Sequence, residues 1–232
     1  MPHTHIIFDL DDTLYPGDSG LMQEIGRRIH VWLCDYLDLT WDQAVVKRRD
    51  YYHRYGTTLG GLAVEHGMDA HDYLVFVHDI PVEDYLDPSP ALAAMLDAIP
   101  LRKAIYTNAT SEYGRRVVQA LGVDDRFEQV IGIEEMSLRN KFHRDAYERA
   151  LSLLDARGHE CIMVEDSAPN LRPAKALGLT TVLVQPDGDS VSVRLNSSHC
   201  QKADDTGEYV DFVVRDVLEV EQIVHRLLLQ KT

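Results

Sequence analysis

Asp9-Leu10-Asp11-Asp12-Thr13-Leu14 follows directly on the apolar run Ile6-Ile7-Phe8, and the fold is decided at this junction. The apolar run has the length and composition of a short buried strand. It places three carboxylates, at positions 9, 11 and 12, just past the end of that strand. Such close carboxylates repel one another and resist losing water unless a cation or protons neutralise them. The stretch is therefore either an acidic turn or a metal site that carries a nucleophile.

Beyond residue 90 the chain alternates between strand and helix patterns. Strands are predicted at 103–107, 130–131, 161–164, 180–184 and 211–214, the last of them as an edge strand. Helices are predicted at 91–99, 111–121, 144–154, 168–177 (with Ser167 as its cap) and 217–229. This alternation is typical of an α/β fold with a parallel, doubly wound sheet. Functional groups of such sheets gather at the carboxyl ends of the strands. Five candidates fall just past predicted strand ends: Asp9, Thr107, Asn108, Glu165 and Asp166.

A helical insertion separates the first strand from the alternating region. Tyr15-Pro16-Gly17 breaks regular structure, and the next apolar residues, Met22, Ile25, Ile29, Leu33 and Leu37, recur at helical spacing. A second helix is expected to run from about 45 to 55 and to stop at Gly56, and glycines 60, 61 and 67 are expected to separate further short helices. His66, His71 and His78 are expected at the surface of this module.

Prolines flank both crossings between the insertion and the rest of the chain, at Pro16 and in Leu86-Asp87-Pro88-Ser89-Pro90. Two hinge segments of an inserted domain need such stiff, irregular backbone. We therefore expect a core of residues 1–16 and 87–232 and an all-helical domain of residues 17–86. The polar segment 185–209 is expected to form a long surface loop.

Composition limits the possible partners. The 232 residues are 45% hydrophobic, enough for a core domain with an inserted module. A net charge of −15 does not suit binding to nucleic acid or to an anionic membrane. The three cysteines fit neither a disulfide framework nor a zinc ribbon. With no signal-peptide pattern and no apolar run of ~20 residues, we expect a cytoplasmic monomer or homodimer acting on a small metabolite.

The acidic residues at the predicted strand ends have the chemistry of a magnesium site. Asp9, Glu165 and Asp166 offer hard oxygen ligands, and no cluster of Cys or His accompanies them in the sequence. Mg²⁺ therefore suits the site better than zinc. A small octahedral cation with open positions would attract phosphoryl oxygens.

The neighbouring polar residues predict how a phosphoryl group would be held and transferred. Thr107 and Asn108 supply neutral hydrogen-bond donors, and Lys141 supplies a positive charge. Two carboxylates two residues apart can divide the labour between a nucleophile and a general acid/base. We assign Asp9 as the nucleophile, because it is closest to the strand end, and Asp11 as the acid/base.

Four segments, in this order, resemble the motifs of the haloacid dehalogenase (HAD) superfamily. They are Asp9–Leu14, Tyr106-Thr107-Asn108, Lys141 and Val164-Glu165-Asp166-Ser167, and the resemblance spans residues 6 to about 184. It implies a Rossmann-like core, a cap inserted after the first motif, Mg²⁺ and an aspartyl-phosphate intermediate. It also implies that the metal is held by Asp9, by the backbone carbonyl of Asp11, and by Glu165 or Asp166.

Two details of the motifs refine this resemblance. Dehalogenases of the family lack an aspartate at the second motif position, so Asp11 points to hydrolysis of a phosphate ester. Phe142 follows Lys141 where the family often has proline, which leaves the shape of this loop open.

The stretch from Asp12 to Pro16 and the segment 51–62 resemble the pyrimidine 5′-nucleotidase-like phosphatases of HAD subfamily I, whose cap is helical (C1). This resemblance implies a nucleoside 5′-monophosphate as substrate. A tyrosine of the 51–55 cluster, Tyr52 above all, could stack on a base, although tyrosines at helical spacing fit the core of the cap equally well. Gly56, Thr57 and Thr58 are expected to line the pocket, because a Gly-Thr turn exposes amides and hydroxyls.

Other functions stay open at this point. The enzyme could act on another small phosphometabolite, such as phosphoglycolate or a sugar phosphate, or it could be a phosphomutase, which differs only in cap closure and acceptor. A non-catalytic phospho-aspartate signalling or binding protein is the alternative from a different class. A signalling receiver domain would be a single small domain with its phosphoacceptor after a middle strand, whereas here the candidate nucleophile follows the first strand. A relative that binds proteins and has lost its activity is disfavoured by the intact pair of Asp9 and Asp11.

Overall fold

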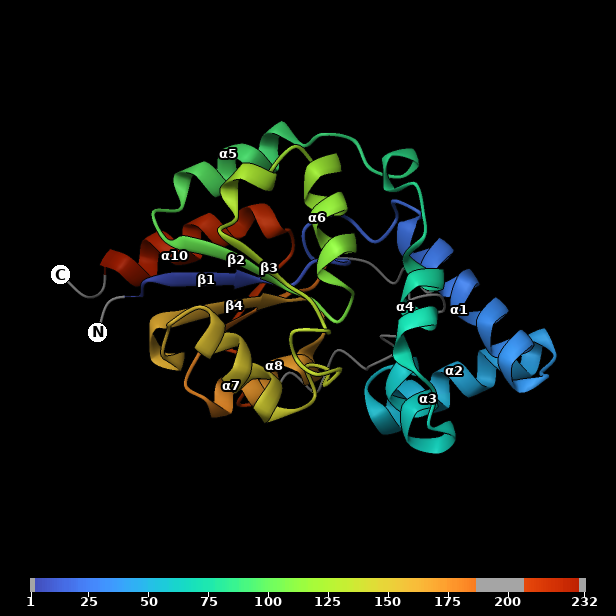
Figure 1. Cartoon of the computed structure of the whole chain (residues 1–232). Coiled ribbons are helices and arrows are strands. Elements are labelled where there is room, and N and C mark those ends of the chain that lie inside the picture. Colours follow the sequence, from blue (N-terminus) through green and yellow to red (C-terminus); the bar gives the residue numbers. More distant parts are fainter. Residues whose placement is uncertain (1–2, 187–206, 230–232) are drawn as a thin grey trace.

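A parallel sheet forms the centre of the larger part of the molecule (Figure 1). We describe residues 3–186 and 207–229 from a computed structural model. Within them six strands pair in the order β3-β2-β1-β4-β5-β6, every neighbouring pair parallel. They are β1 (His5–Phe8), β2 (Arg102–Tyr106), β3 (Gln129–Ile131), β4 (Cys161–Glu165), β5 (Thr180–Val184) and β6 (Phe212–Val214). The predicted α/β class is confirmed, and β6 is an edge strand, as expected.

The register of the strands decides where the functional groups meet. Phe8, the last residue of β1, lies opposite Ile105 of β2 and Val164 of β4. The residues that follow these three strands therefore come together at one edge of the sheet, as in other doubly wound sheets.

Helices cover both faces of this sheet (Figure 1). α5 (Pro90–Ala98), α6 (Ser111–Ala120) and α10 (Val220–Leu229) cover one face, and α7 (Arg144–Leu153) and α8 (Ala168–Ala176) cover the other. Alternate strand residues point to opposite faces: Ile6 and Phe8 pack under the first group of helices, and Ile7 packs under the second. Two hydrophobic layers result, which explains why β1 is apolar without interruption.

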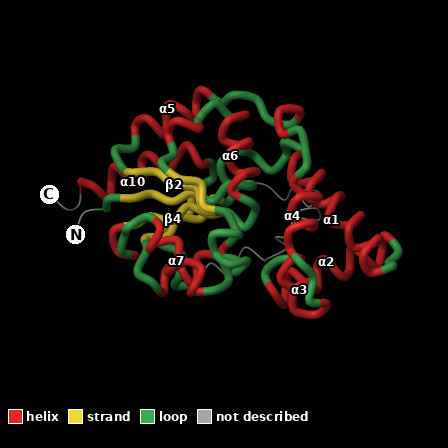
Figure 2. Tube along the Cα trace, in the orientation of Figure 1, coloured by secondary structure: helices red, strands yellow, loops and turns green. Residues whose placement is uncertain are grey.

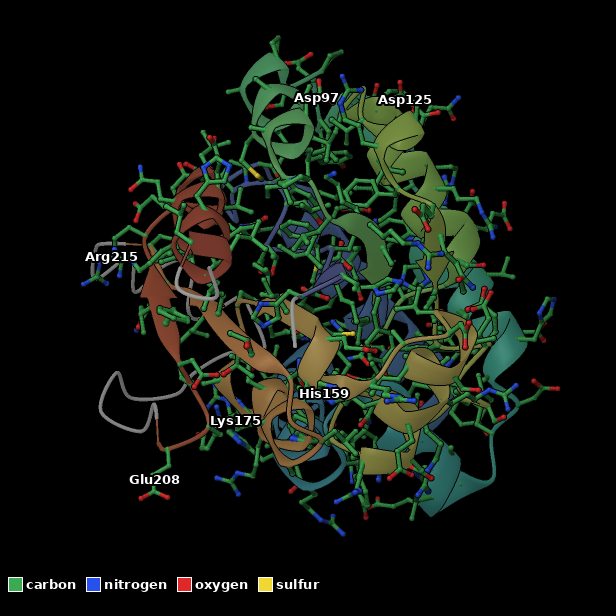
Figure 3. All side chains as sticks on the ribbon, turned by 90° about the vertical axis from the view of Figure 1, so that its left-hand side faces the viewer. Asp97, Asp125, His159, Lys175, Glu208 and Arg215 are labelled. Carbon is green, nitrogen blue, oxygen red and sulfur yellow. The ribbon has the colours of Figure 1, made fainter. Side chains whose placement is uncertain are left out.

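Short 3-10 helices complete this part of the chain: η1 (Val82–Asp84), η2 (Asp124–Arg126), η3 (Gly158–Glu160) and η4 (Val217–Glu219). The predicted helix at 217–229 therefore begins as η4 before α10. Figure 3 looks onto the end of the sheet where β1 begins, opposite to the end that the helical residues 21–78 face. Exposed ion pairs join surface elements on this side. Arg126 reaches Asp97 at 3.0 Å, and Lys175 reaches Asp211 at 2.5 Å. Such exposed pairs contribute little to stability.

Four further helices form a separate body beyond the carboxyl ends of the strands (Figure 2). They are α1 (Leu21–Leu37), α2 (Trp41–Tyr55), α3 (Thr58–His66) and α4 (Ala70–His78). Their packed residues, including Leu33, Tyr51, Leu62 and Tyr73, form a hydrophobic cluster distinct from those of the sheet, joined by Ile133. Leu21 and Ile25 of α1 pack instead in the cluster that contains Ile6 and Phe8 of the sheet. The division into residues 1–16 with 87–232 and residues 17–86 stays a prediction. We call helices α1 to α4 the helical module.

Glycines of the module have two different roles. Gly56 and Gly67 end α2 and α3 with φ of 80° and 63°, a conformation that glycine adopts readily. Gly60 and Gly61 were expected to separate helices, and this is wrong, because both lie inside α3. A Cβ at Gly61 would stand 2.2 Å from the ring of Tyr51, so this glycine allows α2 and α3 to approach closely.

One further expectation is wrong, and another is confirmed in position only. His66 and His71 are exposed, but His78 is buried, because its imidazole stacks on the ring of Tyr113 with centroids 4.7 Å apart. Ser167 occupies the N-cap position of α8, but its side chain makes no capping hydrogen bond there. Residues 187–206 of the expected surface loop lie outside the described ranges. Across the described residues, no helix is both long enough and apolar enough to span a membrane.

Burial of His78 predicts a measurable dependence of stability on pH. Desolvation lowers its pKa to about 4, while the unfolded value is about 6.5. As the pH falls, the unfolded chain therefore binds a proton at this residue before the folded chain does. The free energy of unfolding is unaffected above pH 6.5 and falls by about 3 kcal/mol as the pH approaches 4. We expect His78→Phe to lose less stability than the wild type between pH 6.5 and 4.5, measured by chemical denaturation.

His71, exposed in the same helix, provides the matched control. His71→Phe should give a free energy of unfolding close to that of the wild type, because substitutions of exposed side chains usually change stability little. Parallel stability curves for His78→Phe and the wild type would contradict the prediction.

Candidate active site

Three carboxylates converge at the edge of the sheet where β1 and β4 end. Asp9 follows β1, Glu165 ends β4, and Asp166 comes next. One oxygen from each lies within 4.8 Å of the others, in an arrangement that suits a metal ion. Burial raises the pKa of Asp9 and of Asp166, and the neighbouring Glu165 raises both further. A divalent cation would neutralise this charge, and an all-oxygen donor set fits Mg²⁺.

Lys141 compensates part of this charge. It is fully buried, and its Nζ donates to Oδ1 of Asp9 and, at 2.8 Å, to Oε2 of Glu165. Burial opposes the ammonium charge, but the two carboxylates outweigh it and hold the pKa of Lys141 above its usual value. The predicted lysine therefore joins the loop after β3 to the ends of β1 and β4.

Further hydrogen bonds hold Asp9, Glu165 and Lys141 in place. Oδ2 of Asp9 accepts from the hydroxyl of Thr13 at 3.1 Å, and Oε1 of Glu165 accepts from Nδ2 of Asn170 at 2.9 Å. The backbone N–H of Lys141 donates to Oδ1 of Asn108 at 3.0 Å. The oxygen of Asn108 thus orients the loop that carries Lys141, a contact that was not predicted, and its amide N–H groups stay the predicted donors to substrate.

Asp11 lies apart from the acidic cluster. Its Oδ1 accepts hydrogen bonds from the hydroxyls of Tyr15, at 2.6 Å, and Tyr113, at 2.9 Å. Burial raises the pKa of Asp11, and these two bonds act against that rise. The carboxylate is therefore not one of the clustered metal ligands, which agrees with the implied use of its backbone carbonyl. The sequence offered no signal for Tyr113, which is 102 residues away.

One cavity joins the sheet edge to the helical module. On the sheet side it is lined by Asp9, Asp11, Thr107, Asn108, Glu165 and Asp166. On the module side its lining includes Tyr52, Gly56, Thr57 and Thr58, the four residues expected to bind substrate. All predicted site residues except Lys141, which is buried behind Asp9 and Glu165, thus face one cavity. Their roles stay predictions.

The expected substrate residues also hold the module against the sheet. The Tyr52 hydroxyl lies 3.3 Å from Oγ of Ser167, and its ring meets Phe142 edge-on with centroids 6.1 Å apart. A Cβ at Gly56 would stand 2.7 Å from the Phe142 ring. Thr57 caps α3, accepting from the N–H of Gly60 at 3.0 Å. Phe142, the residue that follows Lys141, therefore forms an aromatic contact with the module.

Comparisons with known proteins agree with this architecture. The model of a family described as haloacid dehalogenase-like hydrolase matches residues 3–178. Glyceraldehyde 3-phosphate phosphatase of Methanocaldococcus jannaschii is 26% identical over 238 residues, covering 96% of this chain and 97% of that protein. Phosphate metabolism protein 8 of Saccharomyces cerevisiae is 26% identical over 132 residues, covering 53% of this chain and 41% of the yeast protein.

Solved structures share the fold. L-2-haloacid dehalogenase from Xanthobacter autotrophicus superposes with a TM-score of 0.62 at 21% identity, covering 97% of this chain and 99% of that one. A HAD phosphatase from Thermococcus onnurineus gives a TM-score of 0.61 at 19% identity, covering 95% and 97%. At such identities the likeness shows the fold alone.

The buried ion pairs predict how the protein responds to loss of Lys141. We expect Lys141→Met to lower the free energy of unfolding by about 3 kcal/mol at pH 8 in the presence of a chelator, because two buried carboxylates lose their cation. Loss of the lysine raises the pKa of Asp9 in the folded state further. A carboxyl whose pKa is raised by folding lowers the free energy of unfolding as the pH rises, because the unfolded state loses its proton first. The deficit should therefore shrink at pH 6, measured by urea denaturation.

Arg139 lies on the same loop and pairs with Asp145 at the surface, at 3.2 Å. Arg139→Met should change stability little at either pH. A deficit for Lys141→Met that is the same at pH 6 and pH 8 would show that the carboxylates do not depend on the lysine.

Proposed function

We propose that this chain, which belongs to the haloacid dehalogenase-like hydrolase family, is a Mg²⁺-dependent phosphatase that forms an aspartyl-phosphate intermediate. The observation that carries the proposal is the placement of two aspartates at one cavity: Asp9 in the acidic cluster, and Asp11 held outside it by two tyrosines. The nucleophilic carboxylate must be ionised, and a metal bound in the acidic cluster would keep it so. The general acid must carry a proton, so it has to lie apart from that metal. The name of the full-length archaeal relative, a phosphatase, supports the same reaction.

Asp9 and Asp11 would act in two steps. In the first, a carboxylate oxygen of Asp9 attacks phosphorus while Asp11 gives its proton to the leaving oxygen. In the second, Asp11 takes a proton from water, which attacks the phosphorus of the aspartyl-phosphate and releases phosphate and the free Asp9 carboxylate. Thr13 and Lys141 keep Asp9 oriented through the contacts described above.

Charge on the phosphoryl group would be balanced by residues from four loops. Thr107 and Asn108 donate hydrogen bonds to its oxygens, and Lys141 supplies a cation. Mg²⁺, when bound by Asp9, the Asp11 carbonyl and Asp166, supplies further charge neutralisation. Glu165 is the alternative to Asp166 as the third ligand, because one oxygen of each lies in the same cluster as Asp9.

We further propose that the helical module is a cap of the subfamily I type and that the substrate is a nucleoside 5′-monophosphate. The cavity continues from the acidic cluster into the module, where the Tyr52 ring lines it. Tyr51, by contrast, is fully buried in the core of the module. Of these two tyrosines, Tyr52 is thus the one placed to stack on a base.

A second candidate substrate is a small sugar phosphate. The archaeal relative that covers nearly the whole chain is named for glyceraldehyde 3-phosphate. Activity on triose phosphates, with none on nucleotides, would favour this candidate. No observation favours a phosphomutase, which would transfer the phosphoryl group to an acceptor other than water.

The reaction is tested by phosphate release from p-nitrophenyl phosphate, with Mg²⁺ and with a chelator. We expect chelation to abolish release, and Asp9→Asn to lower kcat by at least about 10³-fold, because the amide cannot form the phosphoenzyme. Asp12→Asn is the matched control: Asp12 has φ of 58°, which asparagine tolerates, and activity should stay within about fivefold.

No release with any divalent metal would sink the phosphatase proposal. An Asp9→Asn protein with near-wild-type kcat would leave the phosphatase standing and remove Asp9 as its nucleophile.

The tyrosines that bond Asp11 are predicted to be positioning residues. Tyr15→Phe and Tyr113→Phe should each lower kcat about tenfold on an alkyl phosphate, because Asp11 loses a bond that directs its proton. The loss should be much smaller on p-nitrophenyl phosphate, since nitrophenolate leaves without a proton. Tyr51→Phe is the control, because the Tyr51 hydroxyl bonds Glu65 and His66 within the module. Equal losses on both substrates would indicate general damage to the fold instead.

A further inference from the structure

An arginine of α6 joins the sheet part of the molecule to the end of the helical module. The guanidinium of Arg116 donates from Nη1 to the carbonyl of Ile80 at 2.9 Å, and from Nη2 to the carbonyl of His78. His78 is the last residue of α4, and the last carbonyls of a helix have no partner within that helix. A cation at the C-terminus of a helix also interacts favourably with the helix dipole. Arg116 therefore holds the end of α4 against α6.

The same residues contact the buried ring of Tyr113. Tyr113 lies three residues before Arg116 on α6, and the centroid of its ring is 5.9 Å from Cζ of Arg116. The imidazole of His78 stacks on the Tyr113 ring, with centroids 4.7 Å apart and an interplanar angle of 29°. Ile80 packs in the same hydrophobic cluster as Tyr113. The position of the Tyr113 ring is thus set by contacts from α6 and from the end of α4.

The position of Tyr113 in turn affects Asp11. The hydroxyls of Tyr113 and Tyr15 both donate to Oδ1 of Asp11, at 2.9 and 2.6 Å. Two hydrogen bonds to one oxygen orient the carboxyl group and leave Oδ2 to exchange a proton with substrate and water. Proton transfer depends on a short, aligned hydrogen bond, so a small displacement of the Tyr113 hydroxyl should slow it. The chemical steps proposed above name no residue that holds Tyr113 itself.

We propose that Arg116 is a positioning residue for proton transfer by Asp11. It holds the end of α4 against α6, where its own guanidinium and the imidazole of His78 keep the Tyr113 hydroxyl in place against Oδ1 of Asp11. This inference rests on the proposed phosphatase function. Arg116 is not among the described residues that line the cavity with Asp9 and Asp11, so it acts through Tyr113 and not on the substrate.

Benzyl phosphate and p-nitrophenyl phosphate provide the test, because their leaving groups are similar in size and differ in their need for a proton. An alkoxide must be protonated as it leaves, whereas nitrophenolate leaves without a proton. The quantity to compare is kcat/KM, which includes only the steps up to departure of the leaving group. We expect Arg116→Met to lower kcat/KM at least about fivefold for benzyl phosphate and less than about twofold for p-nitrophenyl phosphate.

Three further variants separate positioning from a general effect on the fold. Arg116→Lys keeps a donor for one carbonyl, so it should lose less on benzyl phosphate than Arg116→Met, and it carries the same comparison if Arg116→Met does not fold. Arg115→Met is the matched control, because Arg115 is the preceding residue of α6 and is exposed. It should leave both kcat/KM values unchanged. In a Tyr113→Phe background, Arg116→Met should add less than about a twofold loss on benzyl phosphate, because both changes act through one hydroxyl.

The outcomes separate the two proposals. If the wild type releases phosphate from neither substrate with any divalent metal, the phosphatase function fails. If the wild type is active, and an Arg116 variant that a thermal melt shows to be folded loses equally on both substrates or on neither, the positioning role of Arg116 alone is overturned. Losses of Arg116→Met and Tyr113→Phe that multiply in full overturn it too. So does a wild type that hydrolyses p-nitrophenyl phosphate but not benzyl phosphate, because no proton then reaches an alkyl leaving group.

Discussion

The buried contacts of Lys141 with Asp9 and Glu165 are the interaction on which the rest of this structure depends. They join the end of β1, the end of β4 and the loop after β3 through charges that are nearly inaccessible to water. Charges so deeply buried are tolerated only when each has its partners in place. Thr13, Asn108 and Asn170 supply the remaining hydrogen bonds. The same contacts therefore hold the acidic cluster of the proposed active site and join three loops.

The helical module is connected to this junction at two places. Phe142, beside Lys141, packs on Tyr52 and Gly56 of the module. On the other side, α6 carries Tyr113, which bonds Asp11 and stacks on His78 at the end of α4. The residues that hold the acidic site and the residues that hold the module are therefore neighbours. This arrangement suits a division of labour in which the sheet edge performs the reaction and the module recognises the leaving group.

The fold alone does not choose the reaction. A dehalogenase and a phosphatase superpose on this chain about equally well, with TM-scores of 0.62 and 0.61. The difference must come from individual side chains, as it generally does in widely shared folds. Here Asp11, which accepts hydrogen bonds from Tyr15 and Tyr113, argues for protonation of a leaving oxygen.

The sequence by itself determined the α/β class, the helical insertion and the residues of the acidic site, because periodicity and clustered carboxylates are local signals. It also placed β6 at an edge and Gly56 at the end of a helix. Only the tertiary structure decided that His78 is buried, that Gly61 serves helix packing, and that Tyr113 bonds Asp11. Each of these facts depends on a contact between residues that are distant in the chain or that lie on different helices. Local patterns carry no information about such contacts, because the sheet and the packed helices must form before the partners meet.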